Sequence, residues 1–362
     1  MSAVRATRLA SPRLTGLLRP ALLPTSQRAA FSLSAHLSKP GVIKETEVPV
    51  SVYTPDSKGA ASTNPDHFTI PVKPINQQSA APHSDQQTPK VTPLQESVYQ
   101  RLPKTLRDMT VHNKVIIITG GARGLGNYMA QACAEAGAKA IAIFDANQDL
   151  GDAAAAVLHQ QTGLPVSFFR VDVRDEHAIQ TAVQNVSDLY GVPDVLINSA
   201  GIADSNIPAE TYDTAMFRRL IDINLTGSFL TAQAVGKAMM AAKKPGSIIL
   251  VASMSGSIVN YPQEQSCYNA SKAGVLQLGK SLAAEWAKYG IRVNCISPGY
   301  MDTELNRVPA LEAQKKIWKS LTPQGRLGGV DELNGLAVFL ASDASSFMTG
   351  ANVIIDGGYT LY

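Results

Sequence analysis

Short apolar runs alternate with longer amphipathic segments from residue 111 to residue 362. Seven of these runs are rich in β-branched residues and are bounded by glycine, proline or polar residues, which is typical of buried strands. They cover residues 114–121, 140–145, 165–173, 194–201, 246–253, 291–299 and 352–358. Strands separated by helical segments, such as 125–138 and 146–163, form a parallel sheet covered on both faces. The pattern therefore predicts a single doubly wound α/β domain over residues 110–362.

The first 109 residues lack this alternation. Residues 1–44 contain seven lysines or arginines and no acidic residue, and arginines interrupt every short apolar run. That composition is typical of a mitochondrial transit peptide and predicts delivery to the matrix. The alternative is a basic tail that is not a targeting signal, which would leave the protein in the cytoplasm. Residues 45–109 are rich in Pro, Ser, Thr and Gln and predict a flexible linker, so that a disordered extension precedes the domain, with one short helix at 94–106.

Composition and charge exclude several classes of protein. The chain has 362 residues and a formal net charge of +3, but removing residues 1–44 leaves 25 basic residues against 29 acidic ones. This balance argues against a nucleic-acid-binding body, and the absence of a long apolar run argues against a membrane span. The cysteines lie far apart and the six histidines form no cluster, so neither a disulfide framework nor a metal site is predicted; the cysteines are Cys133, Cys267 and Cys295. We expect all three to be packing residues.

The first strand runs directly into a glycine-rich turn, TGGARGLG, from Thr119 to Gly126. Such a turn between a strand and a helix directs the free N–H groups of the helix at a pyrophosphate, which predicts a Rossmann-type dinucleotide site. Asp145 ends the second strand, where a carboxylate can bind the ribose hydroxyls and repel a 2′-phosphate. NAD is therefore the predicted coenzyme. Arg123 in the turn could pair with a 2′-phosphate, so NADP is the alternative.

Tyr268 and Lys272 are four residues apart in a segment with helical character, which puts them one turn apart on the same face. A free tyrosine has a pKa near ~10 and is a poor base at neutral pH. A neighbouring ammonium and the positive ring of an oxidised nicotinamide would lower that pKa, so the pair could exchange a proton with an alcohol. A buried tyrosine packed beside the stem of a lysine is the alternative interpretation.

These motifs together resemble the short-chain dehydrogenase/reductase family, in its compact single-domain branch, from about residue 111 to residue 362. The motifs are TGGARGLG, VDV at 171–173, NSAG at 198–201, INLTG at 223–227, YNASK at 268–272, SPGYMDT at 297–303 and MTGANVIIDGG at 348–358. The resemblance implies coenzyme contacts from Thr119, Gly120, Arg123, Gly124, Leu125, Gly126, Asp145, Asp172, Val173, Asn198, Ala200, Gly201, Tyr268, Lys272, Pro298, Gly299, Met301 and Thr303. It also implies a homotetramer or homodimer formed through the long helices that carry Asn224 and Tyr268.

The resemblance also implies a reversible hydride transfer between a secondary alcohol and the nicotinamide. Tyr268 would act as the acid–base group, and Lys272 would bind the nicotinamide ribose and lower the pKa of Tyr268. Asn224 would hold a water in the proton relay. Ser253 follows the fifth strand and is the predicted hydrogen-bond donor to the substrate oxygen, although Ser255 gives the spacing to Tyr268 that is more usual in the family.

The segment around Tyr268 resembles the fungal polyol and ketose enzymes of the family: sorbose reductases, xylulose reductases, mannitol 2-dehydrogenases and D-arabinitol 2-dehydrogenases. We therefore expect a small alcohol or ketone substrate, with D-arabinitol first. Ser255, Gln263 and Gln265 are the predicted substrate-binding residues, and Asn260 lies in the same loop. Solvated loop amides are the alternative.

Two other functions compete with polyol oxidation. One is an NADPH-dependent ketoreductase for acyl or polyketide substrates, and the other is a dinucleotide-binding scaffold without turnover. A scaffold should lack Asn224, the serine, Tyr268 or Lys272, and all are present.

Residues 304–325 resemble the helical lid of the family, with Trp318 as a wall of the pocket.

Overall fold

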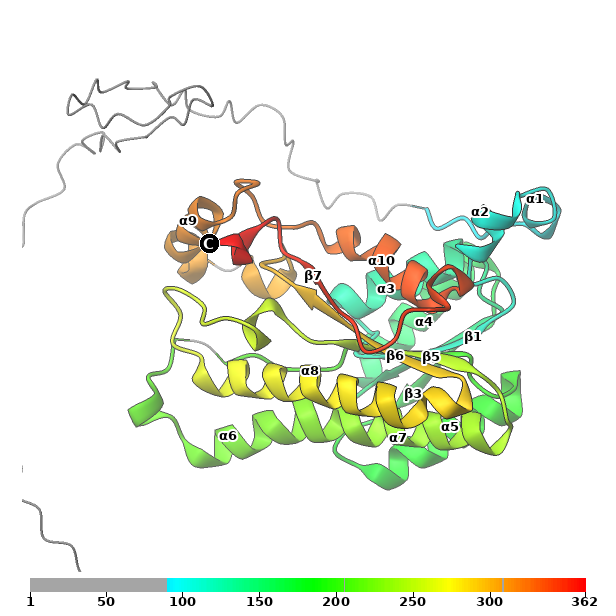
Figure 1. Ribbon diagram of the computed structural model, residues 1–362, viewed down its shortest axis with the longest axis horizontal. Coiled ribbons are helices and arrows are strands. Elements are labelled where there is room, and N and C mark those ends of the chain that lie inside the picture. The colour runs from blue at the N-terminus through cyan, green and yellow to red at the C-terminus, as the bar shows by residue number, and fades with distance from the viewer. Residues whose placement is uncertain (1–89, 205, 308) are drawn as a thin grey trace, which may run out of the picture. The chain divides into compact units, whose positions relative to one another are not determined.

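The computed structural model describes residues 90–204, 206–307 and 309–362. Within these residues one parallel sheet has the strand order β3-β2-β1-β4-β5-β6-β7 (Figure 1). Its strands are β1 (Val115–Thr119), β2 (Ala140–Asp145), β3 (Val166–Arg170), β4 (Val195–Asn198), β5 (Gly246–Val251), β6 (Ile291–Pro298) and β7 (Asn352–Ile355). All seven predicted strands are present, and the predicted doubly wound fold is confirmed. The predicted transit peptide and most of the predicted linker lie outside the described residues.

Helices cover both faces of the sheet (Figure 1). One face carries α3 (Gly124–Glu135), α4 (Gln148–Thr162) and α10 (Asn334–Ala341), and the other carries α5 (Glu176–Tyr190), α7 (Gly227–Ala241) and α8 (Ser266–Trp286). The remaining α-helices of the described part are α1 (Glu96–Tyr99), α2 (Lys104–Asp108), α6 (Thr214–Ile221) and α9 (Glu312–Leu321). In the part of the chain that the structure describes, no helix combines the length and the apolar character that crossing a bilayer requires.

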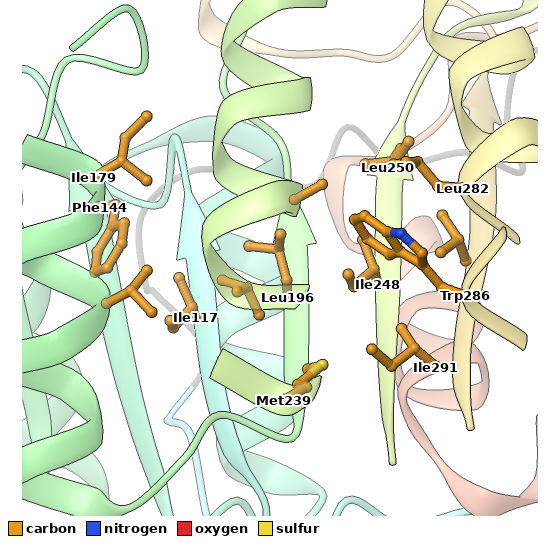
Figure 2. Close-up of a cluster of buried hydrophobic side chains, with 14 of the residues drawn as sticks. Ile117, Phe144, Ile179, Leu196, Met239, Ile248, Leu250, Leu282, Trp286 and Ile291 are labelled. Atoms are coloured by element: carbon orange, nitrogen blue, oxygen red, sulfur yellow. The ribbon is translucent and has the colours of Figure 1, made fainter. Parts of the chain in front are cut away.

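Alternation along each strand divides the core into two apolar layers. Ile117 of β1 and Leu196 of β4 face the layer under α5, α7 and α8, which Figure 2 shows together with Trp286 of α8. Ile116 and Ile118 of β1 face the opposite layer under α3, α4 and α10. Because both faces are covered, the strands are apolar at successive positions, which is why continuous apolar runs revealed them in the sequence.

Polar residues at the helix ends fix where the helices begin and end. The Asn147 side chain accepts a hydrogen bond from the backbone N–H of Leu150 at 3.0 Å, and Asp175 accepts one from Ala178 at 3.0 Å. Such caps satisfy backbone donors that have no partner inside the helix. Gly163 ends α4 with a φ of 70°, a left-handed conformation that favours glycine. Capping residues and glycine thus determine where these helices begin and end, and burial of their apolar faces determines how they are oriented on the sheet.

Residues 90–113 are packed against the edge of α3. Val91 and Val111 are buried, and the backbone N–H of Leu94 donates to the carbonyl of Glu135 at 3.0 Å. The single helix expected at 94–106 is present as the two short helices α1 and α2. The last part of the predicted linker therefore belongs structurally to the domain.

Replacing Leu196 by alanine should destabilise the fold strongly, because the side chain is 0% exposed at the centre of the sheet. We expect the free energy of unfolding to fall by about 2–5 kcal/mol, measured by urea denaturation. The matched control is Leu189→Ala on α5, where the same side chain is 61% exposed and the expected change is within about 0.5 kcal/mol. Equal losses in the two variants would contradict this location of the core.

Candidate active site

The predicted site residues come together at the carboxyl ends of the strands. The strand order reverses direction between β1 and β4, which are neighbours in space but not in sequence. In open parallel sheets a crevice forms outside the carboxyl ends at such a point, because the two connections leave in opposite directions. The loops after β1, β4, β5 and β6 carry the glycine-rich turn, the NSAG motif, the serines and the SPGYMDT motif.

The glycine-rich turn is built by backbone contacts that side chains would prevent. A Cβ on Gly126 would lie 2.3 Å from the carbonyl oxygen of Gly120, and Gly120 itself has a φ of 64°. Gly124 has a φ of 59°, and no atom lies within 4 Å of where its Cβ would be. The Arg123 side chain accepts no hydrogen bond from the first N–H groups of α3. Arg123 itself is exposed, and Leu125 is half-buried.

A buried side-chain pair ties the turn to the NSAG motif. Thr119 Oγ1 donates to Asn198 Oδ1 at 2.6 Å and accepts from the backbone N–H of Ala200 at 3.0 Å. Asn198 Nδ2 in turn donates to the carbonyl of Ser228 at 3.2 Å. Thr119 and Asn198 are both buried, so their polar groups are used inside the protein. These two residues fix the relative position of β1, β4 and α7 at the crevice.

The two predicted acidic contacts differ in their surroundings. Asp145, at the end of β2, accepts hydrogen bonds from the backbone N–H groups of Ala122 and Asn147 at 3.3 and 3.0 Å, which holds its carboxylate beside the glycine-rich turn. Asp172 forms an ion pair with Arg174, and this pairing lowers the pKa of Asp172. Sequence reasoning did not identify Arg174 as a partner. Val173 is buried beside Gly227.

Ser253, Tyr268 and Ser255 lie next to one another although they come from two elements. Ser253 follows β5, and its Oγ donates to Ser255 Oγ at 3.0 Å and accepts from the Ser255 backbone N–H at 3.1 Å. Ser253 also lies within hydrogen-bonding reach of Tyr268, in the first turn of α8, and this contact acts to lower the pKa of the phenol. The choice of Ser253 over Ser255 as the catalytic serine stays a prediction.

Lys272 and Asn224 lie close to each other, and Lys272 lies next to the Tyr268 ring. Lys272 is buried, its Nζ lies 5.7 Å from the centroid of the Tyr268 ring, and it donates to the carbonyl of Val251 at 2.9 Å. A Cβ on Gly201 would lie 3.2 Å from Asn224 Oδ1 and 3.6 Å from Lys272 Nζ. The structure thus brings all four predicted catalytic residues into one cluster.

Asn224 lies in a π-helical turn, Asp222–Thr226, between α6 and α7. Its Nδ2 donates to the carbonyl of Ile202 at 2.9 Å and to Ser271 Oγ at 3.0 Å, and its Oδ1 accepts from the backbone N–H of Ile202 at 2.9 Å. Such turns inside helices are frequent at functional sites. Here the amide binds the segment after β4.

The predicted acidic phenol depends on a bound oxidised nicotinamide, and the protein alone does not lower the pKa of Tyr268. Burial raises the pKa of Tyr268, and the hydrogen bond from Ser253 opposes that rise only in part. Burial also lowers the pKa of Lys272 to about 8. The physical reason is desolvation, which disfavours phenolate and ammonium alike.

The predicted substrate-binding residues form a hydrogen-bonded cluster on the loop before α8. Gln265 Nε2 donates to Asn260 Oδ1 at 2.8 Å and faces Ser255 Oγ at 3.3 Å, and Gln263 Nε2 donates to Gln265 Oε1 at 3.1 Å. Tyr300 joins this cluster through Gln263 and Asn260, and sequence reasoning missed it. Its position directly after the proline and glycine of SPGYMDT was the available signal.

The segment after β6 leads from the sheet to α9. A Cβ on Gly299, which follows Pro298, would lie 2.6 Å from Asp356 Cα, so the chain passes close to the segment after β7. Met301 is buried and pairs with Gly328 in a parallel bridge, and Thr303 is half-buried. The predicted helical segment 304–325 contains two short 3₁₀ turns and α9. Trp318 of α9 stacks on Tyr300 with ring centroids 4.2 Å apart.

The three cysteines are buried, as expected of packing residues. Cys133, Cys267 and Cys295 are buried free thiols, and burial raises the pKa of Cys133 to about 12. Among the described residues, no three or more His, Cys, Asp and Glu side chains are grouped so that they could hold a metal ion.

The residues of the crevice fit a nicotinamide dinucleotide. The open space at Gly124 and the uncapped N-terminus of α3 suit a pyrophosphate, for which backbone N–H groups are the ordinary ligands. Asp145 would meet the ribose of the adenosine half, and Lys272 with Tyr268 would meet the nicotinamide half. No other group is required to explain why these residues converge.

Known proteins match the chain over this domain. A family model described as enoyl-(acyl carrier protein) reductase matches residues 120–360. The sorbose reductase of Schizosaccharomyces pombe is 41% identical over 251 residues, which cover 69% of this chain and 97% of that protein. A ribulose-forming D-arabinitol 2-dehydrogenase of Candida tropicalis is 38% identical over 281 residues, or 74% of this chain and 99% of that protein. The crystal structure of a gluconate 5-dehydrogenase from Burkholderia cenocepacia, in complex with NADP and tartrate, is 35% identical with a TM-score of 0.67 and covers 71% of this chain and 99% of that one.

These matches agree with the geometry of the crevice. The family model begins in the glycine-rich turn and ends after β7, so it spans strands β2 to β7 and every predicted catalytic residue. The relatives align over nearly their whole length, and their names describe oxidoreductases of sugars, polyols and sugar acids. The chain belongs to the short-chain dehydrogenase/reductase family and is an NAD(P)-dependent oxidoreductase.

Proposed function

We propose that the protein oxidises a secondary alcohol of an acyclic polyol to a ketose with NAD, and that D-arabinitol is the first substrate to test. The observation that carries the chemistry is the single cluster of Ser253, Tyr268, Lys272 and Asn224 beside the glycine-rich turn. The polyol is supported by relatives named for sorbose and D-arabinitol.

Tyr268 takes the proton of the alcohol while the carbon–oxygen bond becomes a carbonyl, and it returns a proton in the reverse direction. Ser253 donates a hydrogen bond to the substrate oxygen, where negative charge develops. The bound nicotinamide supplies the acceptor for the hydride that leaves the alcohol carbon. Lys272 keeps most of its positive charge at neutral pH, because its pKa of about 8 lies above 7. That charge favours the phenolate form of Tyr268 during the transfer.

NAD is the proposed coenzyme because the Asp145 carboxylate is held beside the glycine-rich turn by two backbone N–H groups. A fixed negative charge there repels a 2′-phosphate and accepts hydrogen bonds from the ribose hydroxyls. The exposed Arg123 is the residue that would favour NADP, and the gluconate 5-dehydrogenase structure holds NADP. Asp145 and Arg123 therefore have opposite effects on the preference between NAD and NADP, and we assign the larger effect to Asp145.

We further propose a location in the mitochondrial matrix and assembly as a homotetramer or homodimer. The location is supported by the basic, acid-free composition of residues 1–44. Assembly is supported by apolar side chains that stay exposed on the helical layer of α6 and α7: Met216, Phe217 and Phe229.

A panel of pentitols and hexitols should give NADH absorbance with the full-length protein, and D-arabinitol should be among the best substrates.

Tyr268→Phe should lower kcat on the order of 10²-fold or more, because the variant has no phenolic proton to exchange. Coenzyme binding, followed by nicotinamide fluorescence, should persist in this variant. Turnover only of acyl or polyketide ketones with NADPH would favour the ketoreductase alternative, and coenzyme binding without any turnover would favour the scaffold.

Replacing Asp145 by arginine should shift the ratio of kcat/KM values from NAD toward NADP. The carboxylate that repels the 2′-phosphate is removed, and a cation that can pair with it is introduced. Initial rates with both coenzymes at fixed polyol concentration measure this ratio. Asp149→Arg on the first turn of α4 makes the same charge change outside the turn and serves as the control. An unchanged ratio in the Asp145 variant would contradict the role of this residue.

A further inference from the structure

Four side chains beside Ser255 form a closed ring of hydrogen bonds, here called the amide ring: Asn260, Gln263, Gln265 and Tyr300. Gln265 Nε2 donates to Asn260 Oδ1 at 2.8 Å, and Asn260 Nδ2 donates to the Tyr300 hydroxyl at 3.0 Å. The Tyr300 hydroxyl donates to Gln263 Oε1, and Gln263 Nε2 donates to Gln265 Oε1 at 3.1 Å. Each member therefore donates once and accepts once in the same direction around the ring.

This arrangement is stiff for two physical reasons. Hydrogen bonds that follow one direction polarise one another, so each strengthens the next. Asn260 and Gln265 are only 4% and 6% exposed, so a broken bond would leave polar groups buried without a partner. Such a group would carry an uncompensated desolvation cost. The amide ring is thus favoured as a complete unit.

One amide hydrogen of the ring reaches toward the catalytic serines. Gln265 Nε2 donates one hydrogen to Asn260, and its second hydrogen is shared between Asn269 Oδ1 at 2.9 Å and Ser255 Oγ at 3.3 Å. Ser255 in turn fixes Ser253 Oγ, through its backbone N–H at 3.1 Å and its own oxygen at 3.0 Å. A continuous chain of contacts therefore leads from the ring to the side chain that hydrogen-bonds Tyr268.

The opposite side of the ring is held by aromatic packing. The Tyr300 ring stacks on Trp318 of α9 with an interplanar angle of 6°, and the ring of Tyr359 packs edge-on against it at 5.2 Å. Trp318 is 2% exposed, so it cannot move without opening the packing under α9. These contacts hold the Tyr300 hydroxyl in place, and the position of that hydroxyl determines where the other members of the ring can bond.

We propose that the amide ring is a positioning device for the catalytic serine, in which Gln265 and Tyr300 act through Ser255 and do not touch the reacting atoms. The proposal rests on the proposed alcohol oxidation, in which Ser253 donates to the substrate oxygen. It also changes the role of Gln263 and Gln265: amide groups that are bonded within the ring orient the site, and they are not free for substrate hydroxyls.

The first test is kinetic. Gln265→Met and Tyr300→Phe each open the ring while keeping a side chain of similar shape, and the second keeps an aromatic ring against Trp318. We expect kcat to fall on the order of 10-fold in each, because a small misplacement at the reacting centre carries a large kinetic cost. The KM for NAD should stay within about twofold, since the ring lies away from the glycine-rich turn. Gln184→Met on α5, an exposed amide, is the matched control.

The path through Ser255 is tested in the double variant. In a Ser255→Ala background, Gln265→Met should add little to the loss that Ser255→Ala causes alone, because the connection is already broken. Losses that multiply, or a Gln265→Met variant with unchanged kcat, would overturn the proposal. Gln263→Met opens the ring at a less buried member and provides the same measurement if Gln265→Met does not fold.

A spectroscopic readout is independent of the substrate. Ultraviolet titration with bound NAD, taken as the difference from Tyr268→Phe, follows the Tyr268 phenol. Its midpoint should be higher in Gln265→Met, because the hydrogen bond from Ser253 lowers the pKa of Tyr268. The titratable groups facing Tyr268 are Lys272 on α8 and Tyr300 after β6, and Gln265→Met leaves both in place. A raised midpoint without turnover of any polyol would reject the substrate and keep the ring; an unchanged midpoint would reject the ring.

Discussion

A single buried bond, from Lys272 Nζ to the carbonyl of Val251, joins helix α8 to the end of strand β5. It is made by an ammonium that burial destabilises, as the lowered pKa of Lys272 records. Tyr268 precedes Lys272 by one helical turn. The bond from Lys272 to Val251 therefore also positions the Tyr268 side chain relative to the sheet. Ser253 leaves the same strand two residues after Val251. The acid–base residue and the hydrogen-bond donor are thus aligned by the same backbone contact.

The remaining catalytic residue is aligned by a different device. Asn224 binds both the N–H and the carbonyl of Ile202, as a neighbouring strand would, although it belongs to a helix. Asn224 lies in the π-helical turn at Asp222–Thr226, a local departure from the regular helix. The segment after β4 is therefore tied to α6 and α7, and Gly201 comes to lie against both Asn224 and Lys272.

The sequence predicted the sheet because buried parallel strands are continuous apolar runs. Helix spacing placed Tyr268 and Lys272 on one face, whereas Ser253 and Asn224 were predicted from the resemblance to the family. The amide ring could not be predicted, because Gln263 and Tyr300 are 37 positions apart and meet only when two loops fold together. The effect of burial on the pKa of Tyr268 could not be predicted for a related reason: the proximity of Lys272 is visible in the spacing, but desolvation depends on tertiary packing.

The raised pKa of Tyr268 has a consequence for the direction of the reaction. In the protein alone the phenol is held protonated, which is the form needed to donate to a ketone. The base form is favoured only when further positive charge lies beside the ring, and an oxidised nicotinamide carries that charge whereas a reduced one does not. Tyr268 would therefore be an acid with the reduced coenzyme and a better base with the oxidised one. Desolvation by the protein and charge on the ligand together match the proton state of Tyr268 to the half-reaction at hand.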